Sequence, residues 1–137
     1  MLLANEYVAE KEFKKAISVL KKLTRVNPDS VQAYFFIGTI EERYQNSPQR
    51  ALTAYRDALS IEAGNIGVMS AMAQLYLNMG NFAKALEMYE DIVHFDPEDV
   101  TAQLKAALIY YELKDYDKAI GAFEDILAQN PDADKIR

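Results

Sequence analysis

Apolar residues in the last part of the chain recur every three or four positions, in two groups separated by the short polar turn Lys114-Asp115. The groups consist of Leu104, Ala107, Leu108 and Tyr111, followed by Ala119, Ile120, Phe123, Ile126 and Leu127. This spacing places the apolar side chains of each group on one face of a helix. The pattern therefore predicts two antiparallel helices that form a helical hairpin.

A recurring alanine shows that the chain consists of similar units. The alanines are 35, 34 and 34 residues apart, and each is followed twelve residues later by proline or, once, by alanine. The positions are Ala16, Ala51, Ala85 and Ala119, followed by Pro28, Ala63, Pro97 and Pro131. A period near 34 is typical of helical repeat arrays, in which each unit buries its apolar face by stacking on its neighbours. We expect a single domain over residues 1–137, with repeats of about 1–30, 31–65, 66–99 and 100–133 and the start of a truncated next helix at 134–137.

Short polar residues stand where each helix is expected to begin, since their side chains can accept the free amide hydrogens of a first helical turn. We expect first helices to begin after Ser30, Asn65 and Asp99, and second helices after Ser47, Asn81 and Asp115. Pro48 suits the first turn of its helix. The prolines that close the units stop the second helices, because proline disfavours helical geometry in the residue before it.

The second unit departs from this pattern in two ways. It has one extra residue between Gly38 and Ala51, so either its inter-helix turn is longer or its first helix extends. It also ends in Ala63-Gly64-Asn65 instead of at proline. Gly64 can take the left-handed conformation that stops a helix.

In register, the four units resemble the tetratricopeptide repeat (TPR), whose pattern is a bulky residue, Leu followed by Gly or Ala, then Tyr, Ala, an aromatic residue and Pro. From unit one to unit four, the matching residues are Leu3-Ala4, Tyr7, Ala16, Leu20 and Pro28; Tyr34, Ile37-Gly38, Ala51, Tyr55 and Ala58; Met72-Ala73, Tyr76, Ala85, Tyr89 and Pro97; and Ala106-Ala107, Tyr110, Ala119, Phe123 and Pro131. The resemblance implies an all-α fold, a right-handed α-solenoid of stacked antiparallel helical hairpins. Gln103 stands where the family prefers a large apolar residue, which predicts looser packing there.

The resemblance also implies where a partner binds. In the family, the first helices line the concave side of the superhelix, and their non-core positions face an extended peptide or another protein. In this chain those positions are Asn5, Val8, Phe35, Thr39, Glu42, Ser70, Gln74, Leu77, Leu104, Leu108 and Tyr111. Many are apolar, which predicts a partner with an apolar segment, because monomers seldom expose contiguous apolar patches without a use. The alternative is that neighbouring helices partly bury Phe35, Leu104 and Leu108.

A subclass of the family binds the C-terminal carboxylate of heat-shock chaperones through a clamp of Lys, Asn and Arg on the first helices. Only Asn5 matches this clamp in units one to three, and only Lys105 matches it in units two to four. A carboxylate in an apolar groove needs charge-assisted donors. We therefore do not expect this chain to bind chaperone tails.

The composition argues against catalysis and against nucleic-acid binding. The chain has no cysteine and one histidine, His94, which leaves no thiolate chemistry and a single imidazole near a helix end. Asp96, Glu98 and Asp99 surround Pro97 in an inter-repeat turn, where acidic residues favour the N-terminus of the next helix. We expect no enzymatic activity, no metal and no cofactor. The net charge of −6 and the lack of Lys or Arg among the groove positions argue against the related RNA-binding repeats.

These observations predict a non-enzymatic adaptor or scaffold that holds a protein partner in a partly apolar groove. No apolar run approaches the ~18 residues that cross a membrane, and no intact signal peptide is present, so we expect a water-soluble protein of undetermined compartment. Repeat arrays usually close with a polar capping helix, which this sequence lacks. Either the chain is a segment of a longer repeat protein, or its exposed ends pair with another copy. Self-assembly through the groove or the ends is the alternative function.

Overall fold

The computed structural model describes residues 1–129, which form eight α-helices and, within that range, no β-strand. The helices are α1 (Leu2–Ala9), α2 (Phe13–Val26), α3 (Val31–Arg43), α4 (Pro48–Ile61), α5 (Ile66–Asn78), α6 (Phe82–Phe95), α7 (Val100–Glu112) and α8 (Tyr116–Gln129). Each expected repeat supplies two of them. The all-α fold class predicted from the repeat pattern is confirmed.

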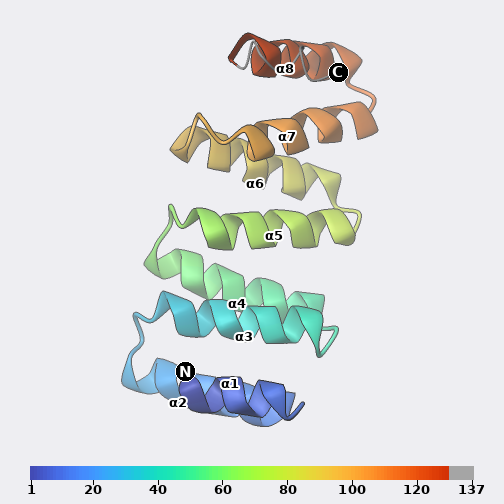
Figure 1. Cartoon of the computed structure of the whole chain (residues 1–137). Helices are drawn as coiled ribbons and strands as arrows, with labels where there is room; N and C mark the ends of the chain where they lie inside the picture. The colour runs from blue at the N-terminus through green and yellow to red at the C-terminus, as the bar shows by residue number, and fades with distance from the viewer. Residues whose placement is uncertain (130–137) are drawn as a thin grey trace. The chain divides into compact units, whose positions relative to one another are not determined.

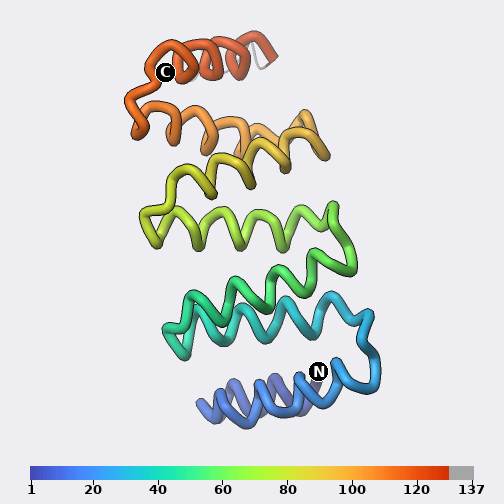
Figure 2. Tube along the Cα trace, turned by 180° about the vertical axis from the view of Figure 1, so that it is seen from behind, coloured from blue at the N-terminus to red at the C-terminus, as the bar shows by residue number. Residues whose placement is uncertain are grey.

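The chain divides into two compact units, Met1–Val68 and Met69–Arg137, and the boundary lies inside α5. In the first unit, α1 with α2 and α3 with α4 form antiparallel hairpins, and α2 packs against α3 (Figure 1). In the second unit, α7 and α8 form a hairpin, and α6 packs against α7 (Figure 2). Within each unit, therefore, the second helix of one repeat contacts the first helix of the next.

The recurring alanines lie at contacts between packed helices. Ala16, Ala51, Ala85 and Ala119 are all buried. In the first unit, Ala16 belongs to a core cluster that also contains Leu20, Ile37 and Ile40. A methyl side chain lets neighbouring helices come close, and larger apolar residues fill the space around that contact. The 34-residue period is therefore the period of this close contact.

A tight contact of this kind joins Gly38 on α3 to Tyr55 on α4. A β-carbon built on Gly38 would lie 2.4 Å from Cε1 of Tyr55, which is closer than any side chain tolerates. The Tyr55 ring is 1% exposed and cannot move aside without disturbing the core. Gly38 is therefore needed because of the space that this ring occupies.

The predicted helix starts are confirmed at all six positions. At five of them the polar side chain accepts an amide hydrogen from the first turn, with donor–acceptor distances of 3.0–3.4 Å, at Ser30, Asn65, Asn81, Asp99 and Asp115. The expected capping role of Ser47 is wrong. Its hydroxyl donates to the carbonyl of Gln45 at 3.1 Å, because the longer turn before α4 brings that carbonyl within reach.

The extra residue of the second repeat lies in the turn and not in the helix. Helices α3, α5 and α7 each contain 13 residues. The turn from α3 to α4 spans residues 44–47, whereas the turns at 79–81 and 113–115 are one residue shorter. Asn46 takes the left-handed conformation in the longer turn (φ 48°), at the register position that Gly80 (φ 76°) holds in the next repeat.

The expectation that a left-handed Gly64 stops α4 is wrong. The helix ends at Ile61, and Glu62 leaves helical geometry at φ −132° and ψ 88°, nearly the same values as Asp96 before Pro97 (φ −136°, ψ 88°). Both turns also close with a similar backbone hydrogen bond, from Asn65 to Glu62 at 3.2 Å and from Asp99 to Asp96 at 3.1 Å. The turn without proline therefore has the same backbone course as the turn with it. Pro131 and residues 134–137 lie outside the described residues.

We predict that Gly38→Ala lowers the free energy of unfolding by about 1–3 kcal/mol, because the added methyl group collides with Tyr55. The matched control is Gly121→Ala on α8, where an added β-carbon meets nothing within 4 Å. That substitution should raise stability by about 0.5–1 kcal/mol, since alanine is the better helix former. Urea unfolding followed by circular dichroism measures both, and a Gly38→Ala protein as stable as the wild type would contradict the packing account.

Candidate functional site

None of the eleven expected groove residues is buried. Seven are partly buried and four are exposed. The exposed four are Asn5, Leu104, Leu108 and Tyr111. The two compact units present these residues differently, and each unit is described separately.

In the first unit, the expected groove residues are largely engaged within the protein. The Phe35 ring is partly buried and tilts against Tyr55, with ring centroids 5.7 Å apart. The Thr39 hydroxyl donates to the Phe35 carbonyl at 3.0 Å. Glu42 accepts a hydrogen bond of 2.8 Å from the Tyr55 hydroxyl, and burial together with this bond raises the pKa of Tyr55 well above its ordinary value. This surface is therefore ordered, with few polar groups left to bind a partner.

In the second unit, α7 presents a row of exposed apolar side chains along one face. Leu104, Leu108 and Tyr111 are 42%, 46% and 56% exposed, and Val100, one turn earlier, is 39% exposed. The spacing of four, four and three residues keeps all four side chains on the same side of a helix. We call Val100, Leu104, Leu108 and Tyr111 the α7 stripe. Leu104 and Leu108 thus keep nearly half of their surface exposed, whereas Phe35 is more deeply covered.

Val100 is the member of the α7 stripe that the sequence interpretation missed. The family pattern supplied the groove positions, and it assigned none to the first residue of this helix. The signal was present in the sequence, because Val100 lies four residues before Leu104. Extending the helical period by one turn would have found it.

A polar contact between α5 and α7 lies beside the α7 stripe. The Lys105 ammonium donates to Gln74 Oε1 at 3.4 Å, and Gln74 Nε2 donates to Asn78 Oδ1 at 3.1 Å. The structure thus brings Gln74, an expected groove residue, together with Lys105, the single residue that matched a carboxylate clamp. Lys105 is partly buried and engaged with an amide oxygen, which makes it a poor receptor for a free carboxylate.

The apolar surface continues beyond the end of α7. The rings of Tyr111 and Tyr116 pack edge to face with centroids 5.5 Å apart. Tyr116 and Leu113, which lies in the turn, are both exposed. Aromatic side chains are common at the centres of protein interfaces.

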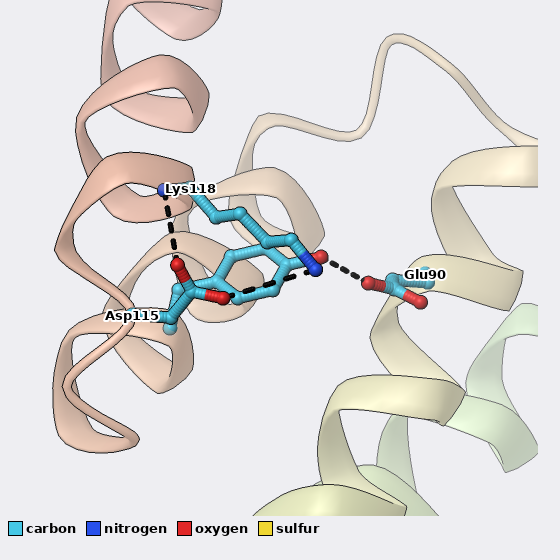
Figure 3. Close-up of polar contacts among 4 residues, drawn as sticks. Glu90, Asp115 and Lys118 are labelled. Atoms are coloured by element: carbon cyan, nitrogen blue, oxygen red, sulfur yellow. Dashed lines mark hydrogen bonds and ion pairs between the residues drawn. The ribbon is translucent and has the colours of Figure 1, made fainter.

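Tyr110 holds α7 in position against α6. Its hydroxyl donates to Glu90 Oε1 across the contact between the two helices (Figure 3). The Lys118 ammonium lies over the Tyr110 ring, 5.7 Å from its centroid, and is 3.8 Å from Asp115 Oδ2. The hydrogen bond to Glu90, followed by burial, raises the pKa of Tyr110 from 10 to about 12. The hydrogen bond to Glu90 joins α7 to α6.

Gln103 links three segments near the start of α7. Its side-chain nitrogen donates to the Pro97 carbonyl at 2.6 Å and to Gln129 Oε1 at 3.0 Å. A pocket of about 250 Å³ lies beside it, lined also by Val93 and Ile126. The amide therefore joins the inter-repeat turn to the end of α8 at a position where the family prefers an apolar contact.

The residues considered for catalysis or metal binding take part in local contacts at helix ends and turns. His94 is exposed near the end of α6, and its ring packs edge-on against Phe95 at 5.9 Å. Asp96 accepts from the Glu98 amide at 3.2 Å, and Asp99 caps α7. Over residues 1–129, no group of three or more His, Cys, Asp or Glu side chains is placed to hold a metal ion. Over the same range, no helix is long and apolar enough to cross a membrane.

Comparison with known proteins agrees with this architecture. A sequence profile of the tetratricopeptide repeat matches residues 1–65 and 70–134. The structure of a tetratricopeptide repeat protein from Parabacteroides merdae ATCC 43184 is similar, with a TM-score of 0.81 and 30% identity over 93% of this chain and 51% of that one. MamA is similar at a TM-score of 0.80 and 24% identity, over 98% of this chain and 73% of that one. YrrB, described as a TPR protein with an unusual peptide-binding site, has a TM-score of 0.71 and 20% identity over 94% of this chain and 66% of that one. No curated protein matches.

We predict a loss of stability at alkaline pH that depends on Tyr110. Because its pKa in the folded protein is raised to about 12 from 10, its stabilising contribution is complete below pH 10 and is lost as the pH rises through the folded pKa. The free energy of unfolding of the wild type should therefore fall relative to that of Tyr110→Phe between pH 10 and about 12. Urea unfolding at a series of pH values measures the difference, and a difference that stays constant across this range would contradict the assignment.

Proposed function

Because this chain belongs to the tetratricopeptide repeat family, whose members are generally non-enzymatic scaffolds for protein interactions, we propose that it binds a protein or peptide with an apolar segment. The proposed contact surface is the groove face of its first helices. In the second unit this surface consists of Ser70, Gln74, Leu77 and the α7 stripe; in the first unit it consists of Asn5, Val8, Phe35, Thr39 and Glu42.

The α7 stripe is the observation that carries this proposal. It exposes two leucines, a valine and a tyrosine along about three turns of one helix. Burying one such side chain in an interface stabilises a complex by roughly 1.5–3 kcal/mol before the entropic cost of association. The polar pair of Lys105 and Gln74 borders the stripe and offers hydrogen bonds at its edge. An apolar segment with polar flanks fits this arrangement.

The first unit is proposed to contribute specificity more than affinity. Phe35 is already packed on Tyr55, and Glu42 already accepts a hydrogen bond, so little new apolar area is buried there. Asn5 is exposed and can donate to a peptide carbonyl. The peptide-binding site described for YrrB, a structure with the same fold, is consistent with a peptide ligand.

We predict that the double substitution Leu108→Glu and Tyr111→Glu reduces partner affinity at least about 100-fold, because it places two carboxylates in the apolar contact. Both side chains are exposed, so the helical content and the unfolding midpoint should stay close to those of the wild type. The partner is first isolated from the native source with the wild-type chain. Its affinity for each variant is then measured by calorimetry.

The matched control changes two exposed apolar residues outside the groove face, Val26→Glu and Phe95→Glu. This protein has the same added charge and should bind the partner with wild-type affinity. If the α7 variant still binds as tightly as the control, the stripe is not the contact surface and the proposal fails.

Self-association is the second candidate, and it is favoured by the exposed face of α8. Ile120 is 55% exposed, whereas Ile17 and Leu52, which hold the same register position in the first two repeats, are buried. A large aliphatic residue is therefore buried at this position in the first unit and exposed on α8. A second copy of the chain is a natural occupant of such a face.

Sedimentation velocity distinguishes this second candidate from the first. If α8 mediates self-association, the wild type should sediment as a concentration-dependent dimer, and Ile120→Glu should convert it to a monomer. The groove variant at Leu108 and Tyr111 should leave the dimer unchanged. A wild-type chain that stays monomeric at high concentration would exclude self-association through α8.

A further inference from the structure

The first unit contains a pocket of about 450 Å³ on the face formed by α2, α3 and α4. It is lined by residues of the second helices α2 and α4 and of the first helix α3, and none of the expected groove residues belongs to it. Ile37 and Ala54 form buried apolar walls, and Lys21, Arg50 and Asp57 are exposed at the rim. The volume lies in the range of small-molecule sites.

A buried carboxylate lies in this pocket without a partner. Glu41 is 5% exposed, and its Oε2 has no hydrogen-bond partner among the described residues. No ion pair joins it to Lys21 or to Arg50 in that part of the chain, although both line the same pocket. An unpaired buried carboxylate is costly, and a cation that reaches it relieves that cost.

The repeat register distinguishes this pocket from its counterpart in the second unit. Tyr7, Tyr76 and Tyr110 each follow the small residue of their first helix by three positions, and in the second repeat that position is Glu41, three after Gly38. At the contact between α6 and α7, the Tyr110 hydroxyl reaches Glu90, and the equivalent pocket beside Glu90, Val93 and Gln103 is smaller, at about 250 Å³. The second repeat therefore has a short acidic side chain where the other repeats have a ring.

The residues that face each other at this contact also differ in charge between the two units. Glu90 precedes Tyr110 by 20 residues, and Lys21 precedes Glu41 by the same interval. On α6 and α7, the Glu90 carboxylate accepts from a phenol. At the same positions on α2 and α3, an ammonium (Lys21) and a carboxylate (Glu41) line the pocket. This pocket presents an anionic floor and a rim with two cations and one carboxylate.

From this arrangement we infer that the pocket binds a basic α-amino acid, either free or as the C-terminal residue of a peptide. The side-chain guanidinium or ammonium pairs with Glu41 at the floor, and the alkyl stem lies against Ile37 and Ala54. The α-carboxylate meets Lys21 and Arg50 at the rim. Asp57 lies at the same rim and accepts the α-ammonium when the amino acid is free.

This inference is tested by titrating the full chain with four probes while recording amide chemical shifts by NMR. The probes are L-arginine, agmatine (which lacks the carboxylate), L-citrulline (which lacks the side-chain charge) and an N-acetylated tetrapeptide that ends in arginine. L-arginine or the peptide should saturate and shift the amides of the pocket residues. Agmatine and citrulline should each bind at least about tenfold more weakly, since each loses a charge-assisted contact. Saturation by the peptide alone would identify a chain terminus as the source.

Three variants complete the test. Glu41→Gln keeps the shape and removes the charge, so it should weaken binding at least about tenfold. Glu41→Tyr restores the ring found in the other repeats and removes the carboxylate, which should narrow the pocket and abolish binding while the chain stays folded by circular dichroism. Glu10→Gln, an exposed residue outside the pocket, is the control and should bind as the wild type does.

The inference is overturned if neither arginine nor the peptide saturates, if citrulline binds as tightly as arginine, or if Glu41→Gln binds like the wild type. These results do not depend on the proposed partner surface. Glu41→Tyr leaves the α7 stripe unchanged, and the groove variant at Leu108 and Tyr111 leaves the pocket unchanged. Failure of one proposal is therefore distinguishable from failure of the other.

Discussion

The close approach of two helices at a small residue is the constraint on which the architecture of each repeat depends. At Gly38 the contact is so tight that even one methyl group has no room beside Tyr55. The buried alanines that recur along the chain permit similar approaches. A hairpin closed in this way has a defined spacing, and its outer apolar surfaces can then pack against the next hairpin. The candidate functional surfaces follow from that spacing, because they lie on the helix faces that are not buried between helices.

The repeats of this protein differ in the polar residues at the contact between successive repeats. One register position carries tyrosine in three repeats and glutamate in the second. In the second unit the tyrosine joins α7 to α6 through a hydrogen bond to Glu90. In the first unit, Glu41 lines a larger pocket than the equivalent one in the second unit, and its Oε2 is buried without a partner. A single position in the repeat thus contributes to rigidity in one place and to a candidate ligand site in another.

The sequence predicted most of the local structure correctly, because helix boundaries depend on neighbouring residues. Capping side chains and prolines act within one turn, so their effects can be read from order alone. The errors at Ser47 and Gly64 have the same origin. At each, the expected role was the commonest one for that residue type. Ser47 instead donates to a carbonyl of its own turn, and α4 ends at the extended residue Glu62, before Gly64 is reached. The length of the turn before α4 was decided by packing, since α3 kept the same 13 residues as its counterparts.

By itself, the sequence determined the repeat period, the all-α class, the family and the set of positions from which a groove is expected to form. Those features depend on residue type and spacing, and both can be read directly from the sequence. Only the tertiary structure decided which of those positions are free. Leu104, Leu108 and Tyr111 face solvent while Phe35 is partly covered by Tyr55, and exposure depends on neighbours distant in sequence. The buried carboxylate of Glu41 is likewise visible only in three dimensions, because burial and lack of a partner are properties of the packed chain.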